Sequence, residues 1–206
     1  MTEVIIVKDG QLLRSIDVQA GQRTDMVLLV MPGVSCDVKL DIRMSGEGAE
    51  ANVYGAYVCG GEEKVKIAVD MYHDLPHCNS RQLFKGIAGG TSRVDFYGKI
   101  IVAQDAQRTE AYQENHNILL TDGAKVDTKP QLEIYADDVK CSHGATIGRL
   151  NEEEQFYMRS RGISLEDAKV LQMISFIAPV LEIIQEESER EQLAVRFEEA
   201  IRKLVK

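Results

Sequence analysis

The sequence predicts a mainly β protein with a C-terminal helical segment, because its pattern changes near Leu150. Before Leu150, short runs of β-branched and aliphatic residues are separated by turn signals such as Pro32-Gly33 and Gly60-Gly61. After Leu150, apolar residues recur every three or four positions, which is the period of an amphipathic helix. We therefore expect a β body over residues 1–150 and a helical segment over residues 151–206.

The strands of the β body are predicted from runs that partly alternate between apolar and polar residues. Asp9-Gly10 lies between the first two runs and is a hairpin-type turn signal. A sandwich, a barrel and a β-helix would all give this pattern, so the spacing leaves the kind of β fold open. The runs are Val4–Val7, Gln11–Leu13, Met26–Met31, Cys36–Ile42, Ala51–Val58, Val65–Met71, Arg93–Val102, Arg108–Glu114, Asn117–Leu120 and Gln131–Tyr135.

Three helices are predicted after Leu150, each beginning at a pair of residues that resembles a capping box. Pro179 lies inside the second helix and should kink or break it. The pairs are Asn151 with Glu154 for residues 152–161, Ser164 with Asp167 for 165–187, and Ser188 with Glu191 for 189–205. Two of these helices carry apolar faces that need a docking surface. Those faces contain Leu165, Ala168, Leu171, Ile174 (or Met173), Ile177, Leu181 and Ile184, then Leu193, Phe197, Ile201 and Leu204.

Composition excludes several classes of function. The formal net charge is -9 and the basic residues are scattered, which disfavours a nucleic acid partner. No apolar stretch is long enough to cross a membrane, and the acidic, short apolar N-terminus is not a signal peptide, so we expect a cytoplasmic protein without a membrane partner. The four cysteines are widely spaced and do not predict a disulfide framework.

Two groups of residues are candidate metal ligands. The first is His73, His77 and Cys78, but Pro76 disfavours a metal-binding helix face there, and a strand end entering a polar loop is the simpler interpretation. The second is Cys141 and His143, which would share one face of a strand and form half of a site for iron, zinc or an iron–sulfur cluster. A structural thiol and a surface imidazole are the alternative.

No enzymatic motif is present in the sequence. It contains no nucleophile elbow, no phosphate-binding lysine motif and no dinucleotide-binding glycine fingerprint. The acidic run at residues 152–154 is explained by a helix N-terminus. We therefore expect no catalytic residue and no enzymatic activity.

Several stretches, in order, match one known family. Residues 129–134, 136–146 and 156–163 carry the specific part of this match, and Gly98-Lys99-Ile100, residues 106–111 and Leu119-Leu120 fit as well. Over roughly residues 50–206 the sequence resembles the SufB/SufD family of iron–sulfur cluster assembly. The resemblance implies a right-handed parallel β-helix core with a C-terminal helical segment.

The resemblance also implies partners. Family members dimerise through β-helix edges and dock their helical segment on the ATPase SufC. It therefore implies a SufC-like ABC ATPase as one partner, and a SufB-like subunit or a second copy of this chain as the other. An iron–sulfur cluster or iron, held transiently and shared with the partner, is the implied cofactor. The implied partner-binding residues are Phe156, Tyr157, Arg159, Arg161, Gly162, Ile163 and Leu171.

The sequence departs from SufB-type members at two positions. Ala124 stands where those members carry a cysteine, and Gly144 stands where they carry a glutamate. Both departures resemble SufD, and His143 matches the SufD histidine at the interface with SufB. The leading hypothesis is a short, SufD-like scaffold or accessory subunit. The alternative is a non-catalytic homodimer with no role in cluster assembly.

Overall fold

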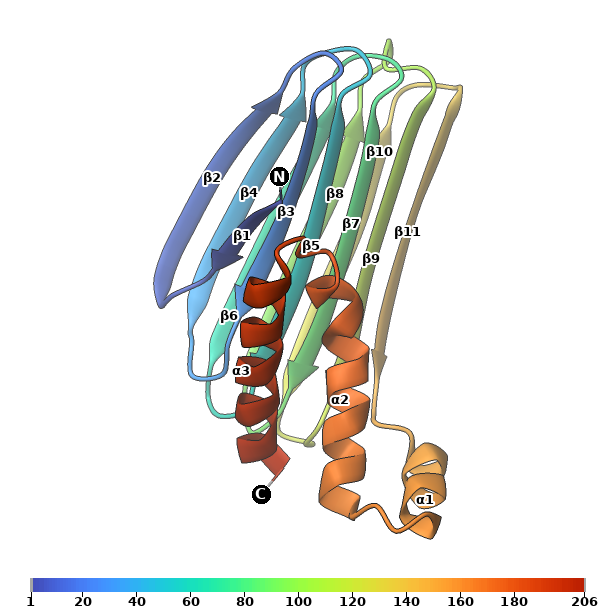
Figure 1. The fold of residues 1–206 in the computed structure, drawn as a ribbon. Coiled ribbons are helices and arrows are strands. Elements are labelled where there is room, and N and C mark those ends of the chain that lie inside the picture. Colours follow the sequence, from blue (N-terminus) through green and yellow to red (C-terminus); the bar gives the residue numbers. More distant parts are fainter. Residues whose placement is uncertain (1, 206) are drawn as a thin grey trace.

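The computed structural model describes residues 2–205, which form eleven strands followed by three helices (Figure 1). The strands are β1 (Glu3–Ile6), β2 (Gly10–Val18), β3 (Arg23–Val30), β4 (Cys36–Met44), β5 (Glu50–Cys59), β6 (Lys64–His73), β7 (Asn79–Ala88), β8 (Arg93–Val102), β9 (Thr109–Leu119), β10 (Lys125–Ile134) and β11 (Val139–Gly148). The helices are α1 (Glu152–Ser160), α2 (Leu165–Leu181) and α3 (Glu187–Val205).

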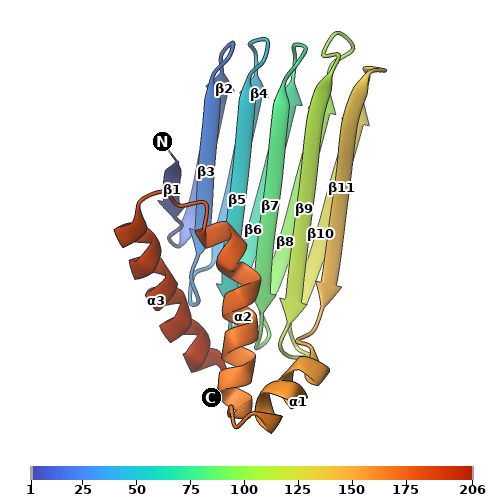
Figure 2. The same ribbon diagram turned by 45° about the vertical axis from the view of Figure 1, so that its right-hand side comes forward.

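The strands form two parallel sheets that lie face to face. Odd-numbered strands make one sheet in the order β1-β3-β5-β7-β9-β11, and even-numbered strands make the other in the order β10-β8-β6-β4-β2. In Figure 2 the odd-numbered strands lie in front and point down, while the even-numbered strands lie behind them and point up. Because successive turns advance from β2 towards β11, the course of the chain is right-handed. The implied right-handed parallel β-helix with C-terminal helices is therefore confirmed.

Residues stack in register from one turn of the β-helix to the next. Arg23 pairs with Glu50, Glu50 with Asn79, and Asn79 with Glu110. Each turn therefore takes roughly 30 residues, within the usual range for a solenoid repeat. This register explains the alternation seen in the sequence, because every second side chain enters the space between the sheets.

The prediction of a hairpin at Asp9-Gly10 was wrong. β1 pairs with β3 and β2 pairs with β4, so this turn is a corner that passes the chain from one sheet to the other. A corner and a hairpin use the same turn residues, and local sequence does not distinguish them. Three strand assignments also change: β9 is one strand where two were expected, and β7 and β11 had not been predicted from apolar runs.

Two glycines inside the β-helix leave space for aromatic rings of neighbouring strands. A Cβ atom on Gly86 would lie 1.8 Å from the Tyr57 ring, and one on Gly55 would lie 2.2 Å from the Phe84 ring. The Tyr57 side chain crosses over β7 and its hydroxyl group hydrogen-bonds both Asn115 Nδ2, at 3.2 Å, and Asn117 Oδ1. All of these side chains are buried, so the last turns have a polar, hydrogen-bonded interior.

The helices begin largely as the capping pairs predict. The Asn151 side chain accepts hydrogen bonds from the backbone N–H groups of Glu153 and Glu154, and Ser164 Oγ accepts one from that of Asp167. The capping box predicted at Ser188 and Glu191 does not form. α3 already begins at Glu187, and the Ser188 hydroxyl group donates a hydrogen bond to the Glu186 carboxylate. α2 includes Pro179 but ends two residues later, at Leu181.

Helices α2 and α3 cover the outer face of the odd-numbered sheet (Figures 1 and 2). α2 packs on β5 and β7, and Val170, Met173 and Ile177 are buried there beside Ile87 of β7. α3 buries Leu193, Phe197 and Ile201 in the same cluster, as predicted. The expected face of α2 is only partly right, because Leu165 and Leu171 are exposed. None of the helices described within residues 2–205 is long and apolar enough to cross a membrane.

Candidate functional site

Three large apolar side chains stand on the surface where α1 meets α2. Phe156 is 72 % exposed, Tyr157 59 % and Leu171 44 %. All three belong to the partner-binding set that the sequence resemblance implies. Neighbouring exposed apolar side chains of this size are typical of a protein-binding surface. We call Phe156, Tyr157 and Leu171 the apolar patch.

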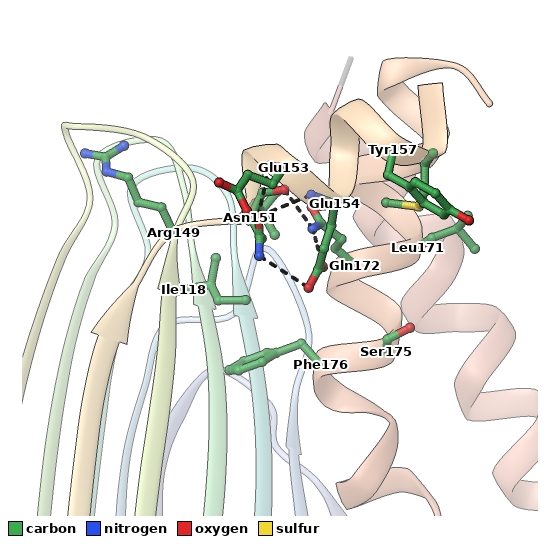
Figure 3. A pocket seen from close by; sticks show the side chains of 12 residues that line it. Ile118, Arg149, Asn151, Glu153, Glu154, Tyr157, Leu171, Gln172, Ser175 and Phe176 are labelled. Atoms are coloured by element: carbon green, nitrogen blue, oxygen red, sulfur yellow. Dashed lines mark hydrogen bonds between the residues drawn. The ribbon is translucent and has the colours of Figure 1, made fainter. Parts of the chain in front are cut away.

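A groove of about 660 Å³ lies beside this patch (Figure 3). Ile118 of β9 and Phe176 of α2 lie at one end of the groove, and Tyr157 and Leu171 lie at the other. The remaining lining residues are Arg149, Leu150, Asn151, Glu153, Glu154, Met158, Gln172 and Ser175. The exposed surface of the groove is mostly apolar although half of its lining residues are polar or charged, which suits the apolar face of an amphipathic segment.

Hydrogen bonds fix α1 relative to α2. Gln172 Nε2 donates to Glu154 Oε2 at 2.8 Å and to the Asn151 carbonyl oxygen at 3.0 Å (Figure 3). The buried Gln155 side chain donates to Gln172 Oε1 at 2.9 Å. The groove is therefore formed between two elements that are already locked together, so little ordering of its walls is needed when a partner binds.

The loop from α1 to α2 holds the other predicted partner-binding residues. Gly162 adopts φ 88, which turns the chain between the two helices. Arg161 lies over the Tyr157 ring at 5.1 Å, and its guanidinium donates to the Tyr157 hydroxyl oxygen at 2.8 Å. Arg159 is exposed and Ile163 is half-buried. The structure thus brings the predicted residues to one end of the molecule.

The second candidate surface is the end of the β-helix formed by β10 and β11. Within the described residues, β10 pairs only with β8 and β11 pairs only with β9, so each leaves one edge unpaired. Pro130 is tolerated in β10 because an edge strand can spare a ladder hydrogen bond. Leu132 and Ile134 pack on the core from β10 but remain partly exposed. We call this surface the open end.

Cys141 and His143 share the inward-facing side of β11, as the strand alternation predicts. They stand in register with Ala111 and Gln113 of β9, which are both buried inside the β-helix. Cys141 is half-buried, and burial raises the pKa of its thiol, although a backbone hydrogen bond involving Ala111 partly opposes this. His143 is exposed. Among residues 2–205, no group of three or more His, Cys, Asp or Glu is placed to hold a metal ion.

His73, His77 and Cys78, the first group of candidate metal ligands, lie in three different local environments. His73 ends β6 inside the core, where its Nε2 lies 2.9 Å from Ser80 Oγ. His77 adopts φ 61 in the following turn, and Cys78 is buried with its thiol directed at the Gly46 carbonyl oxygen, 3.3 Å away. Segment 73–78 is thus a strand end followed by a turn, as the sequence suggested.

Sequence reasoning missed the groove itself. Ile118 and Phe176 form its walls, but they lie 58 positions apart and only the docking of α2 on the odd-numbered sheet brings them together. One signal was present in the sequence: the apolar residues of this helix span more than one face, because Leu171 directly follows Val170 and lies two positions before Met173. A large apolar residue on an otherwise solvent-facing side of a helix indicates a second contact surface.

The described residues thus form a parallel β-helix with an appended helical segment, an apolar groove beside α1 and α2, and an open end. Residues 13–176 match the family described as SUF system FeS cluster assembly, SufBD core domain. The chain therefore belongs to the SufBD core family.

Individual relatives show the same relationship. The chain is 49% identical over 125 residues to the iron-sulfur cluster assembly protein SufD of Escherichia coli, covering 61% of this chain and 30% of SufD. It is 46% identical over 109 residues to a SufBD family protein of Synechocystis, covering 53% of this chain and 24% of that protein. It is 31% identical over 180 residues to a SufBD family protein of Mycobacterium leprae, covering 84% of this chain and 46% of the relative. The chain thus spans less than half the length of these relatives.

Proposed function

We propose that this chain is a non-catalytic scaffold or accessory subunit in SUF-type iron–sulfur cluster assembly, acting in the cytoplasm. In this proposal the helical segment after residue 150 binds a SufC-like ABC ATPase. The open end pairs with a SufB-like subunit or with a second copy of the chain. The observation that carries the proposal is the apolar patch, which lies beside a preformed groove at one end of a SufBD-type β-helix.

The ATPase-docking role is supported by the energetics of the patch. Burying an exposed Phe or Leu side chain contributes roughly 1.5–3 kcal/mol, and aromatic residues at the centre of an interface often dominate its binding energy. Phe156 remains 72 % exposed, because α1 faces α2 with Gln155, whose buried side chain donates to Gln172. A partner surface supplies the missing burial.

Charge substitutions in the patch test this docking role. Phe156→Asp and Leu171→Asp should each abolish binding of a purified SufC-like ATPase in isothermal titration calorimetry. Val195→Asp is the matched control, because Val195 is 55 % exposed on α3, outside the groove. Normal ATPase binding by both patch variants would show that docking takes place elsewhere.

The pairing role is supported by the open end. Unpaired strand edges invite association with other strands unless something covers them. Here the edges of β10 and β11 frame partly exposed apolar residues, including Ile147, which is 46 % exposed. We therefore expect the chain to form a dimer with itself or with a SufB-like subunit. Ile147→Lys should convert that dimer into a monomer in sedimentation velocity, and an unchanged sedimentation coefficient would contradict the pairing surface.

Cys141 and His143 are proposed as part of a transient site for an iron–sulfur cluster or iron, which is the cargo of assembly. A thiolate and an imidazole suit these species, but clusters usually take four ligands, so the partner must contribute the others. Anaerobic reconstitution of the paired complex should give visible absorption that falls in His143→Ala. Absorption that is equal in wild type and in a Cys141→Ala, His143→Ala double variant would remove these residues from the site.

A structural homodimer without a cluster role is the second candidate. It is favoured by Ala124, a buried residue at the position of the SufB-type cysteine, and by the raised pKa of the Cys141 thiol, which disfavours the thiolate. The same reconstitution separates the two candidates. A stable homodimer that acquires no chromophore under any condition supports the structural role.

A further inference from the structure

Lys85 lies on the outward face of β7 and contacts the wall of the groove. Its ammonium nitrogen is 4.6 Å from the centroid of the Phe176 ring, and Phe176 lines the groove. The side chain is half-buried, and this burial lowers the pKa of Lys85, with Glu114 partly opposing the shift. A cation over an aromatic face is stabilised by the ring quadrupole, but only by about 0.5–2 kcal/mol.

Lys85 makes no ion pair with any other residue between 2 and 205, and its neighbours explain why. Glu114 is the nearby carboxylate, but its Oε2 atom lies 3.2 Å from Nε2 of His116. His116 is the register partner of Lys85, and its Nδ1 atom lies 2.9 Å from Thr146 Oγ1. The charge of Glu114 acts on Lys85 from a distance, but no carboxylate among residues 2–205 lies within ion-pair distance of the half-buried ammonium group.

The groove is therefore electrostatically polarised. At the α1 rim it is lined by Glu153 and Glu154, while Arg149, which also lines the groove, pairs with Asp122. The strands are parallel, and α1 follows the C-terminal end of β11. The Lys85–His116 pair of β7 and β9 lies two residues before the Ile87–Ile118 pair, so Lys85 is farther from these C-terminal ends and from α1 than Ile118 is. The acidic rim and the unpaired lysine thus lie at opposite ends of an apolar channel that contains Ile118 and Phe176.

We propose that Lys85 determines which segment can dock in this groove: an amphipathic helix of the ATPase partner that carries a carboxylate at its end nearest Lys85. This inference rests on the proposed docking function and specifies its chemistry. Apolar side chains of the helix fill the channel, in the usual helix-in-groove arrangement. Its carboxylate pairs with Lys85, and the opposite end, near Glu153 and Glu154, is basic or neutral.

The test compares three variants in titrations with a purified SufC-like ATPase. Lys85→Met removes the charge and keeps most of the stem over Phe176, and Lys85→Arg keeps the charge. Lys66→Met is the control, because Lys66 is exposed on β6, in the opposite sheet. Binding is measured at ionic strengths of about 0.1 M and about 1 M, where the Debye length falls from roughly 10 Å to roughly 3 Å. Circular dichroism and thermal melts confirm folding, and Lys85→Gln replaces Lys85→Met if that variant is unstable.

The proposal predicts that Lys85→Met weakens binding about tenfold at low salt and much less at high salt, while Lys85→Arg and Lys66→Met bind like the wild type. Equal affinity and equal salt dependence of Lys85→Met and wild type would overturn the role of Lys85 and leave the docking function intact. Absence of ATPase binding by the wild type would overturn both. A stronger salt dependence in Lys85→Met than in wild type would also contradict the proposed pairing.

Discussion

Replacement of Gly86 by alanine is expected to be severely destabilising. A Cβ atom at this position would lie 1.8 Å from Tyr57 Cε2, 2.2 Å from Cζ and 2.6 Å from Asn117 Oδ1. All three residues are buried inside the β-helix, so the Tyr57 ring cannot move aside without leaving its place between β5 and β9.

The expected magnitude follows from two effects. Overpacking a buried position by one methyl group typically costs about 1–3 kcal/mol. Displacing the Tyr57 hydroxyl group leaves the Asn115 and Asn117 amides without their buried partner, which costs about 1–3 kcal/mol more. We therefore expect Gly86→Ala to lower the free energy of unfolding by roughly 3 kcal/mol or more.

Urea denaturation followed by circular dichroism measures this change. Gly144→Ala is the matched control, because a Cβ atom on Gly144 would meet nothing within 4 Å and the residue has ordinary strand geometry. The control should change the free energy of unfolding by less than about 1 kcal/mol. If Gly86→Ala stayed within 1 kcal/mol of wild type, the interlocked packing of Tyr57 over β7 would be refuted.

Three further predictions concern protonation and pairing. Burial lowers the pKa of His73 to about 3. Between pH 6.5 and pH 3 the histidine is therefore protonated in the unfolded state but neutral in the folded state. The free energy of unfolding should then fall by up to about 1.4 kcal/mol for each pH unit from pH 6.5 towards pH 3. His73→Gln should remove this slope in urea titrations at pH 4 to 7, and an equal slope in the variant would contradict it. Burial opposes ionisation of Glu63, but hydrogen bonds from the backbone N–H groups of Gly33, Gly60 and Gly61 outweigh it and lower its pKa. Glu63→Gln should therefore lower the melting temperature at pH 7 and have little effect at acidic pH, below both pKa values of Glu63; a pH-independent effect would refute this electrostatic role. His143→Ala should reduce the pairing affinity measured by analytical ultracentrifugation without changing the melting temperature of the monomer, because its side chain is exposed at the open end, and a loss of monomer stability would instead indicate a structural role.

The order of strands and helices was largely predictable, but the topology was not. Alternating runs located β3 to β6, β8 and β10, and the capping pairs located the starts of α1 and α2. β11 lacks an apolar run because it lies at the open end, where Ala145 and Thr146 are exposed. β7 was missed because its inward positions hold Ser80, Gln82 and Gly86, which the interlocked interior requires.

The candidate site was predictable only where its residues are close in sequence. Cys141 and His143 follow from strand alternation, Phe156 and Tyr157 follow from the family signature, and Leu171 follows from the helix predicted after that signature. The groove combines residues from β9, α1 and α2, and Lys85 belongs to β7, so their proximity depends on register and helix docking. Such long-range pairings are determined by packing across turns, which local periodicity does not encode.

The central claim is that the chain works as a subunit of a cluster-assembly complex, and purification from the source organism tests it most directly. The tagged chain is isolated under anaerobic conditions and its bound proteins are identified by mass spectrometry, with the Leu171→Asp variant processed in parallel. The account predicts recovery of an ABC-type ATPase with the wild type, its loss with the variant, and a SufB-like chain or a second copy in both. Recovery of the wild-type chain with no ATPase would contradict the account.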